Sequence, residues 1–168
     1  MKTVKSEGGA ALLLVLFSLL LLAYGSMGFV GNALLSRFID RIGAARCILI
    51  SLSFMCTSLL VASEVTHATG MALTLGLWGL GGFSSNSAQQ ARLAAQAPWL
   101  ASASISLNTS AMYAGQAMGA TVGGWTLVHQ GMGALPQHGL IGLLLAIGLS
   151  LLATRYARLH PLRSPEKA

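Results

Sequence analysis

The densest group of charged side chains in the sequence is Asp40-Arg41, followed by Gly43 and Arg46. It interrupts two long apolar runs. A carboxylate where two helices meet can accept hydrogen bonds from the free N–H groups of a neighbouring helix N-terminus and from an adjacent guanidinium. Glycine permits a tight turn there because it has no Cβ. Such a contact is favourable only while the helices are close. A solvated loop whose charges set membrane topology is the alternative interpretation.

A second set of residues that could bind a ligand is polar or aromatic and lies inside apolar segments. Polar side chains at membrane depth usually face protein or a water-filled cavity rather than lipid. Aromatic and amide groups suit a broad, mostly apolar pocket that orients its ligand by a few polar contacts. Packing and interhelical hydrogen bonds explain the same residues equally well. The candidate substrate-cavity residues are Tyr24, Trp78, Asn86, Asn108, Tyr113 and Gln116.

Three glycines, Gly115, Gly119 and Gly123, recur at four-residue steps. In a helix this spacing forms a stripe of small residues on which another helix can pack closely. We therefore predict that they are helix-packing residues.

Catalytic and metal-binding patterns are absent from the sequence. It contains no His-Glu-x-x-His, Gly-x-Ser-x-Gly or Gly-x-x-x-x-Gly-Lys motif, so we expect no enzyme activity. Cys47 and Cys56 fit neither a zinc spacing nor a disulfide framework, and no metal or other cofactor is expected. The basic residues are not interleaved with stacking aromatics, so nucleic acid is not an expected partner.

The composition points to a membrane protein. Of the 168 residues, 54% are hydrophobic and 8% are charged, whereas a soluble domain carries about 25% charged residues. Richness in Gly, Ala, Ser and Leu, without alternation of polar and apolar residues, favours transmembrane helices over a β-barrel. We predict an all-α integral membrane fold with five transmembrane helices. The predicted spans are about 10–35, 47–63, 71–90, 101–128 and 140–156.

Two short polar ends flank this five-helix domain of residues 10–156. Residues 1–9 are predicted to be a polar lead-in, and residues 157–168 a basic cytoplasmic tail. Lys2 and Lys5, followed by an apolar block and Ala23-Tyr24-Gly25, also imitate a cleaved signal peptide. Because the apolar run continues to Leu35, we favour a first membrane span. A signal peptide followed by a four-helix membrane protein is the alternative.

The distribution of Lys and Arg predicts the orientation. Cytoplasmic loops carry the excess of basic residues. If the loop after the first span is cytoplasmic, eight of the ten basic residues lie on that side, against Lys2 and Lys5 outside. We therefore expect an outside N-terminus and a cytoplasmic C-terminus. The eight residues are Arg37, Arg41, Arg46, Arg92, Arg155, Arg158, Arg163 and Lys167.

Two segments resemble the major facilitator superfamily, and within it the drug/proton antiporters and sugar-efflux-like bacterial exporters. Asp40, Arg41, Gly43 and Arg46 match the family's loop Gly-x-x-x-Asp-Arg-x-Gly-Arg-Arg, although Ser36 replaces its first Gly and Ala45 one of its basic residues. Such a degenerate match is typical of the second copy of the loop, between helices eight and nine. Residues 106–124, with Leu-Asn and Gly-Gln-x-x-Gly-x-x-x-Gly-Gly, are similar to helix eleven of these exporters.

The resemblance implies that the five spans are helices eight to twelve of a twelve-helix transporter in the bacterial inner membrane. It implies that the Asp40 loop latches one of two alternating-access states. Export of a small organic solute or drug needs two halves that rock around a midplane site, so we expect a truncated chain that inserts but does not transport alone. The expected partners are the lipid bilayer, a solute once an N-terminal half completes the site, and partner helices. A non-transporting interaction protein or a remnant of a split reading frame is the alternative.

Overall fold

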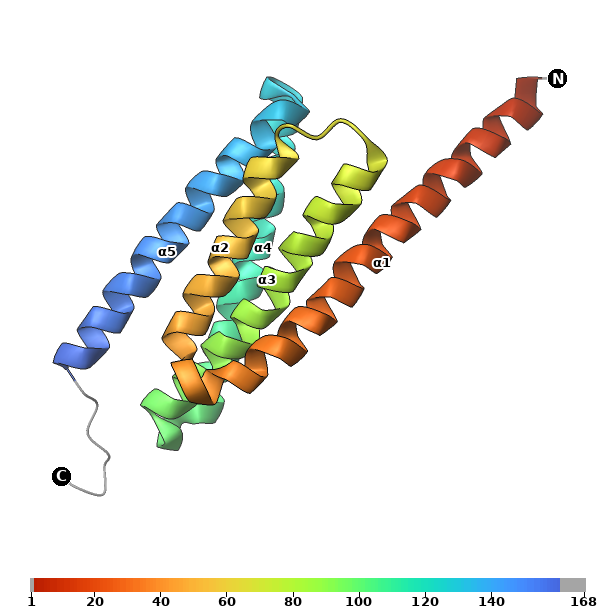
Figure 1. The fold of residues 1–168 in the computed structure, drawn as a ribbon. Helices are drawn as coiled ribbons and strands as arrows, with labels where there is room; N and C mark the ends of the chain where they lie inside the picture. Colours follow the sequence, from red (N-terminus) through yellow and green to blue (C-terminus); the bar gives the residue numbers. More distant parts are fainter. Residues whose placement is uncertain (1, 161–168) are drawn as a thin grey trace.

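The computed structural model describes residues 2–160, and it shows five long α-helices joined by short connections (Figure 1). No β-strand occurs within this range, so the prediction of an all-α fold is confirmed. In chain order the elements are α1 (Lys2–Ile42), α2 (Ala44–Ala62), α3 (Ala68–Gln96), η1 (Pro98–Leu100), α4 (Ala101–Gln130), η2 (Met132–Ala134) and α5 (Leu135–Leu159).

The helices follow the predicted spans but run further at several ends. The polar lead-in is already helical from residue 2, and α1 continues through the charged stretch to Ile42. The expected loop between the first two helices is therefore a single residue, Gly43, and its charges sit on helical turns. The start of the basic tail belongs to α5, while residues 161–168 and residue 1 lie outside the described residues. These differences have one cause: a helix need not end where the hydrocarbon core ends.

Three of the helical segments are long and apolar enough to cross a membrane: Gly9–Ile42, Ala44–Ala62 and Met132–Leu159. A helix rises 1.5 Å per residue, so 19 residues span roughly 29 Å, close to the thickness of the hydrocarbon core. With 29 and 30 residues, α3 and α4 have the length but not the apolarity, since both are rich in Gly, Ser, Thr, Asn and Gln. Two of the five predicted spans thus rest on their length alone.

Two long helices, α1 and α3, cross at small residues. A Cβ on Gly31 of α1 would meet the backbone of Leu80 in α3, and a Cβ on Gly79 would meet the carbonyl oxygen of Tyr24. Glycine at these positions lets the two backbones approach closely, which is how membrane helices gain packing energy without a hydrophobic driving force. The Tyr24 and Phe83 rings close the contact with their centroids 5.5 Å apart.

Buried hydroxyl groups join α2 to α3. The Ser51 and Ser84 Oγ atoms are 2.9 Å apart, and Ser58 Oγ donates to the Thr74 carbonyl oxygen at 2.6 Å. Such bonds satisfy polar groups that lipid cannot. Beside them lies the core cluster of the molecule, which consists of Cys47, Ile48, Leu52, Ala88 and Leu143 and so ties α2, α3 and α5 together.

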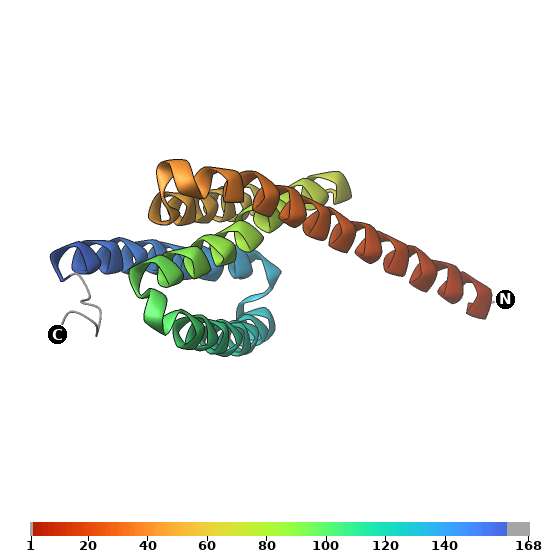
Figure 2. The ribbon, with the colours of Figure 1, turned by 90° about the horizontal axis from the view of Figure 1, so that it is seen from below.

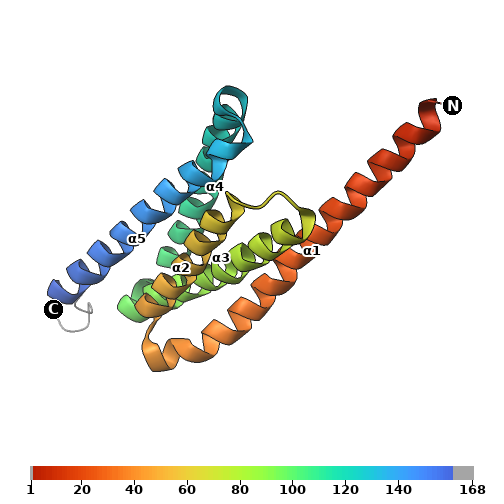
Figure 3. The same cartoon turned by 45° about the horizontal axis from the view of Figure 1, so that its top comes forward.

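The helix α4 and the N-terminal part of α1 are more loosely attached. Seen from below, α4 lies on the opposite side of α3 and α5 from α1 and α2 (Figure 2). The N-terminal part of α1 projects beyond the other helices (Figure 3). The α1–α2 junction and the ends of α3 and α5 lie together at one end of the bundle, far from the N-terminus (Figure 1). This end carries the charged stretch.

Candidate functional site

The charged stretch surrounds a sharp break in the chain at Gly43. Its φ of 87° and ψ of 146° lie where side-chain-bearing residues are strained, and they let α2 begin one residue after α1 ends. Gly43 N–H donates to the Ile39 carbonyl at 2.9 Å, which closes α1, and Cys47 N–H donates back to the Gly43 carbonyl at 3.2 Å. The turn therefore fixes the angle between the two helices.

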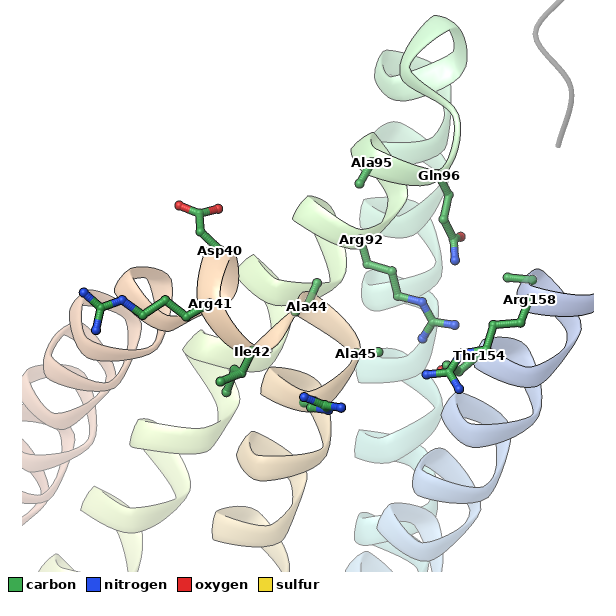
Figure 4. A pocket seen from close by; sticks show the side chains of 13 residues that line it. Asp40, Arg41, Ile42, Ala44, Ala45, Arg92, Ala95, Gln96, Thr154 and Arg158 are labelled. Carbon is green, nitrogen blue, oxygen red and sulfur yellow. The ribbon is translucent and has the colours of Figure 1, made fainter. Parts of the chain in front are cut away.

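An open cavity of about 640 Å³ lies next to this turn (Figure 4). It gathers the four motif residues Asp40, Arg41, Gly43 and Arg46 with residues from the ends of α3 and α5. Four arginines and one aspartate line it, so it is basic. The lining residues contributed by α3 and α5 are Arg92, Ala95, Gln96, Thr154, Ala157 and Arg158.

Arg92 is the buried cation of this cavity. Only 8% of its surface is exposed. Its Nη1 donates to Ser150 Oγ at 3.4 Å, a long bond that links α3 to α5. Burial lowers the pKa of Arg92, but a guanidinium stays protonated at any physiological pH. The Asp40 carboxylate and the Arg41 side chain both point away from Arg92 (Figure 4).

Asp40 thus lies at the helix junction where the latch was expected, but its carboxylate has no partner within residues 2–160. Asp40 and Arg41 are both exposed. The nearby N-terminus of α2 is flanked by arginines rather than by the carboxylate. The role of Asp40 as a latch stays a prediction.

The candidate substrate-cavity residues on α1 and α3 take part in packing. Tyr24 lies in the crossing with α3, and Trp78 packs against the core cluster. Asn86 is half-buried on the same helix as Trp78. None of the six candidates lines the cavity at Gly43.

The candidates on α4 are more open. Asn108 is half-buried, Gln116 is exposed, and Tyr113 has 62% of its surface exposed. A Cβ on Gly115 or Gly119 would meet no atom of the described residues within 4 Å, and one on Gly123 would touch only Leu135 at 3.9 Å. The predicted packing stripe is therefore present but unoccupied in this part of the chain.

Two residues with buried polar groups, Arg92 and Asn32, were not proposed as site residues from the sequence. From the sequence, Arg92 marks the end of the span 71–90, and its burial depends on how the helices pack, which a sequence does not reveal. Asn32 has a buried Oδ1 atom with no hydrogen-bond partner among the described residues. An Asn within an apolar run is the signal that could have drawn attention to it.

The residues 2–160 contain no group of three or more His, Cys, Asp or Glu side chains that could hold a metal ion. His129 and His138 are engaged locally, with Nδ1 atoms 2.9 Å and 3.0 Å from the carbonyl oxygens of Trp125 and Ala134.

These features define a polytopic α-helical membrane protein with a basic cavity at one end. Over 138 residues, 82% of the chain, the sequence is 29% identical to an uncharacterized MFS-type transporter of Bacillus subtilis, YbcL. The match covers 35% of that protein, so the chain spans about a third of the length of this curated relative. No protein-family model matches the chain, and no solved structure matches it.

Proposed function

We propose that the chain is part of a secondary active transporter of the major facilitator superfamily, which exports a small organic solute or drug by alternating access. The similarity to an MFS-type transporter and the apolar helices support this proposal. Alternating access rocks two sets of helices around a site near the bilayer midplane. The five helices described here would form helices eight to twelve, and further helices would complete the site.

The observation that carries the proposal is the open, polar surface of α4. Of its 30 residues only Thr126 is buried, although the helix carries Asn108, Tyr113 and Gln116. Exposed amides are costly against lipid and are tolerated against protein or water. Glycines with open space around them allow another helix to approach closely. This surface is what a cavity-lining helix would present to a second set of helices.

Efflux measurements test the proposal. The coding DNA upstream of the chain should contain about seven further hydrophobic spans of bilayer length. Cells that make the joined product should retain less of at least one compound in a panel of fluorescent drugs and sugars than empty-vector cells, whereas cells that make only residues 1–168 should match the empty vector. Efflux from the 168-residue chain alone would contradict the need for further helices. A joined product without any efflux from the panel would contradict export of these solute classes.

Cysteine labelling tests the cavity-lining role of α4 directly. Gln116 and Met118 are two positions apart on the helix and hence face different directions, and both are exposed. In the joined protein, Gln116→Cys should react with a membrane-impermeant maleimide at least about tenfold faster than Met118→Cys. The thiolate is the reactive form of cysteine, and a thiol that faces lipid neither ionises nor meets a reagent dissolved in water. Wild-type protein controls for Cys47 and Cys56. Equal rates would place Gln116 outside an aqueous cavity.

A second candidate function is a non-transporting membrane interaction protein. The unoccupied Gly115 and Gly119 favour it, since a partner helix could pack there with close backbone contact. Co-purification of a stoichiometric membrane partner, together with no solute binding, would support this function over transport.

A further inference from the structure

The basic cavity at Gly43 has an excess of positive charge that the described residues do not neutralise. Arg41, Arg46, Arg92 and Arg158 line it, against Asp40 alone. The single carboxylate points away from Arg92, whereas Arg92 and Arg158 extend toward the space between α3 and α5 (Figure 4). The site is therefore suited to a negatively charged ligand.

Because it is buried, Arg92 is the arginine that most needs an anion or further hydrogen bonds. A buried cation is costly unless an anion or several hydrogen bonds compensate it. Arg92 is 8% exposed, and the hydrogen bond found for it among the described residues is the 3.4 Å contact with the neutral Ser150 hydroxyl. A guanidinium has five N–H donors, which leaves several free to bind oxygen atoms in the cavity.

The N-terminus of α2 adds donors at the same place. Gly43 provides no side-chain cap, and the first acceptor bond of this turn belongs to Cys47 N–H. The N–H groups of Ala44, Ala45 and Arg46 thus have no acceptor within the helix, and all three residues line the cavity. Free N–H groups and the helix dipole together favour a phosphate or carboxylate.

We propose that this cavity binds the phosphate group of an anionic glycerophospholipid, with Arg92, Arg158 and the α2 N-terminus as its ligands. The cavity lies at the ends of α1, α2 and α5, the three segments that are apolar enough to cross a membrane, so a bilayer around these segments would bring its headgroups close to the cavity. Basic pockets between membrane helices are known to hold anionic headgroups. The exposed Leu151 and Leu152 of α5 lie close to Thr154 and Arg158 in the sequence and offer an apolar surface for the acyl chains. Free phosphate would gain nothing from that surface.

This proposal does not depend on transport and can be tested on the full chain alone. The purified chain, in an uncharged detergent, would be titrated with dioleoyl-phosphatidylglycerol, dioleoyl-phosphatidylcholine or inorganic phosphate, and bound ligand would be counted by native mass spectrometry. Phosphatidylglycerol should bind at least about tenfold more tightly than either of the others, since each basic residue near a charged headgroup contributes roughly fivefold.

Variants locate the site. Arg158→Gln should weaken phosphatidylglycerol binding roughly fivefold, and Arg92→Gln at least as much. Arg155→Gln is the matched control: it removes the same charge from the same helix, but Arg155 is exposed and does not line the cavity. Its binding should change less than twofold. Should Arg92→Gln fail to fold, Arg158→Gln still decides, because Arg158 is exposed.

Four results would overturn the proposal. Equal binding of the two phospholipids would remove the anion preference. Equal losses in Arg155→Gln and Arg158→Gln would indicate diffuse attraction to a basic surface. Inorganic phosphate binding as tightly as phosphatidylglycerol would assign the cavity to a free anion, and displacement of the lipid by a co-purified acidic polypeptide would assign it to a protein partner.

Discussion

At the scale of single residues, the backbone conformation of Gly43 determines how the charged residues on either side of it are placed. Its backbone conformation is open almost only to glycine, and it converts what would be a continuous helix into two helices that share a basic end. The turn brings Arg41 and Arg46 to one cavity, which Asp40 also lines although its carboxylate points away from Arg92. The geometry of the motif therefore rests on a residue without functional groups.

Replacement of this glycine should measurably destabilise the protein. We expect Gly43→Ala to lower the free energy of unfolding by about 1–3 kcal/mol, because a Cβ strains this backbone conformation even though nothing lies within 4 Å of it. Unfolding in mixed micelles of dodecylmaltoside and increasing SDS provides the measurement.

Gly142→Ala is the control for Gly43→Ala. Gly142 also has open space around it but lies within α5, so alanine there should leave stability unchanged or raise it by about 0.5–1 kcal/mol. A Gly43→Ala protein as stable as the wild type would mean that the turn is not constrained to the observed conformation.

At the scale of helices, the α1–α3 crossing is the tightest contact in the described part of the chain. We expect Gly79→Ala to cost about 1–3 kcal/mol, since its Cβ would meet the Tyr24 carbonyl and force the two backbones apart. Gly82→Ala, one turn further along α3 with no atom within 4 Å, should be neutral or stabilising by up to about 1 kcal/mol. The same detergent titration compares them, and equal stabilities would show that α1 does not pack on α3 as closely as described.

The helices were largely predictable from the sequence, and the contacts between them were not. Long runs with few charges located all five helices, and three of these runs are apolar enough that they must satisfy their backbone internally in lipid. The end of α1 was misplaced because Arg37 and Asp40 look like loop residues, yet they are tolerated on an exposed helical turn. The glycines that pack closely include Gly31 and Gly79 but not the regular stripe on α4, since close approach depends on where two helices cross.

The basic cavity illustrates the same limit. The motif residues around Gly43 are close in sequence, and their proximity was expected. Arg92 and Ser150 come from different helices, 58 positions apart, and the packing of both α3 and α5 on α2 brings them together. A sequence pattern reports the charge of each helix end but not which ends share one site.

At the scale of the whole molecule, charge is segregated between the two ends of the bundle. The junction of α1 and α2 and the ends of α3 and α5 meet at one end, which collects Arg41, Arg46, Arg92 and Arg158, while the N-terminus lies at the other (Figure 1). Because loops rich in Lys and Arg stay in the cytoplasm, this end should be cytoplasmic. The structure thereby sharpens an expectation drawn from the sequence into one that concerns a single surface.

Reporter fusions test this orientation. Green fluorescent protein fused after Ala168 should fluoresce, and alkaline phosphatase fused there should be inactive, because the former folds only in the cytoplasm and the latter only outside it. Phosphatase inserted in the α2–α3 connection, after Glu64, should be active, since this connection lies at the opposite end of α2 from Gly43. Replacement of Arg41, Arg46 and Arg92 by Gln should weaken the bias and yield a mixture of both signals. An active phosphatase at the C-terminus of the unaltered chain would invert the assignment and place the basic cavity on the external face.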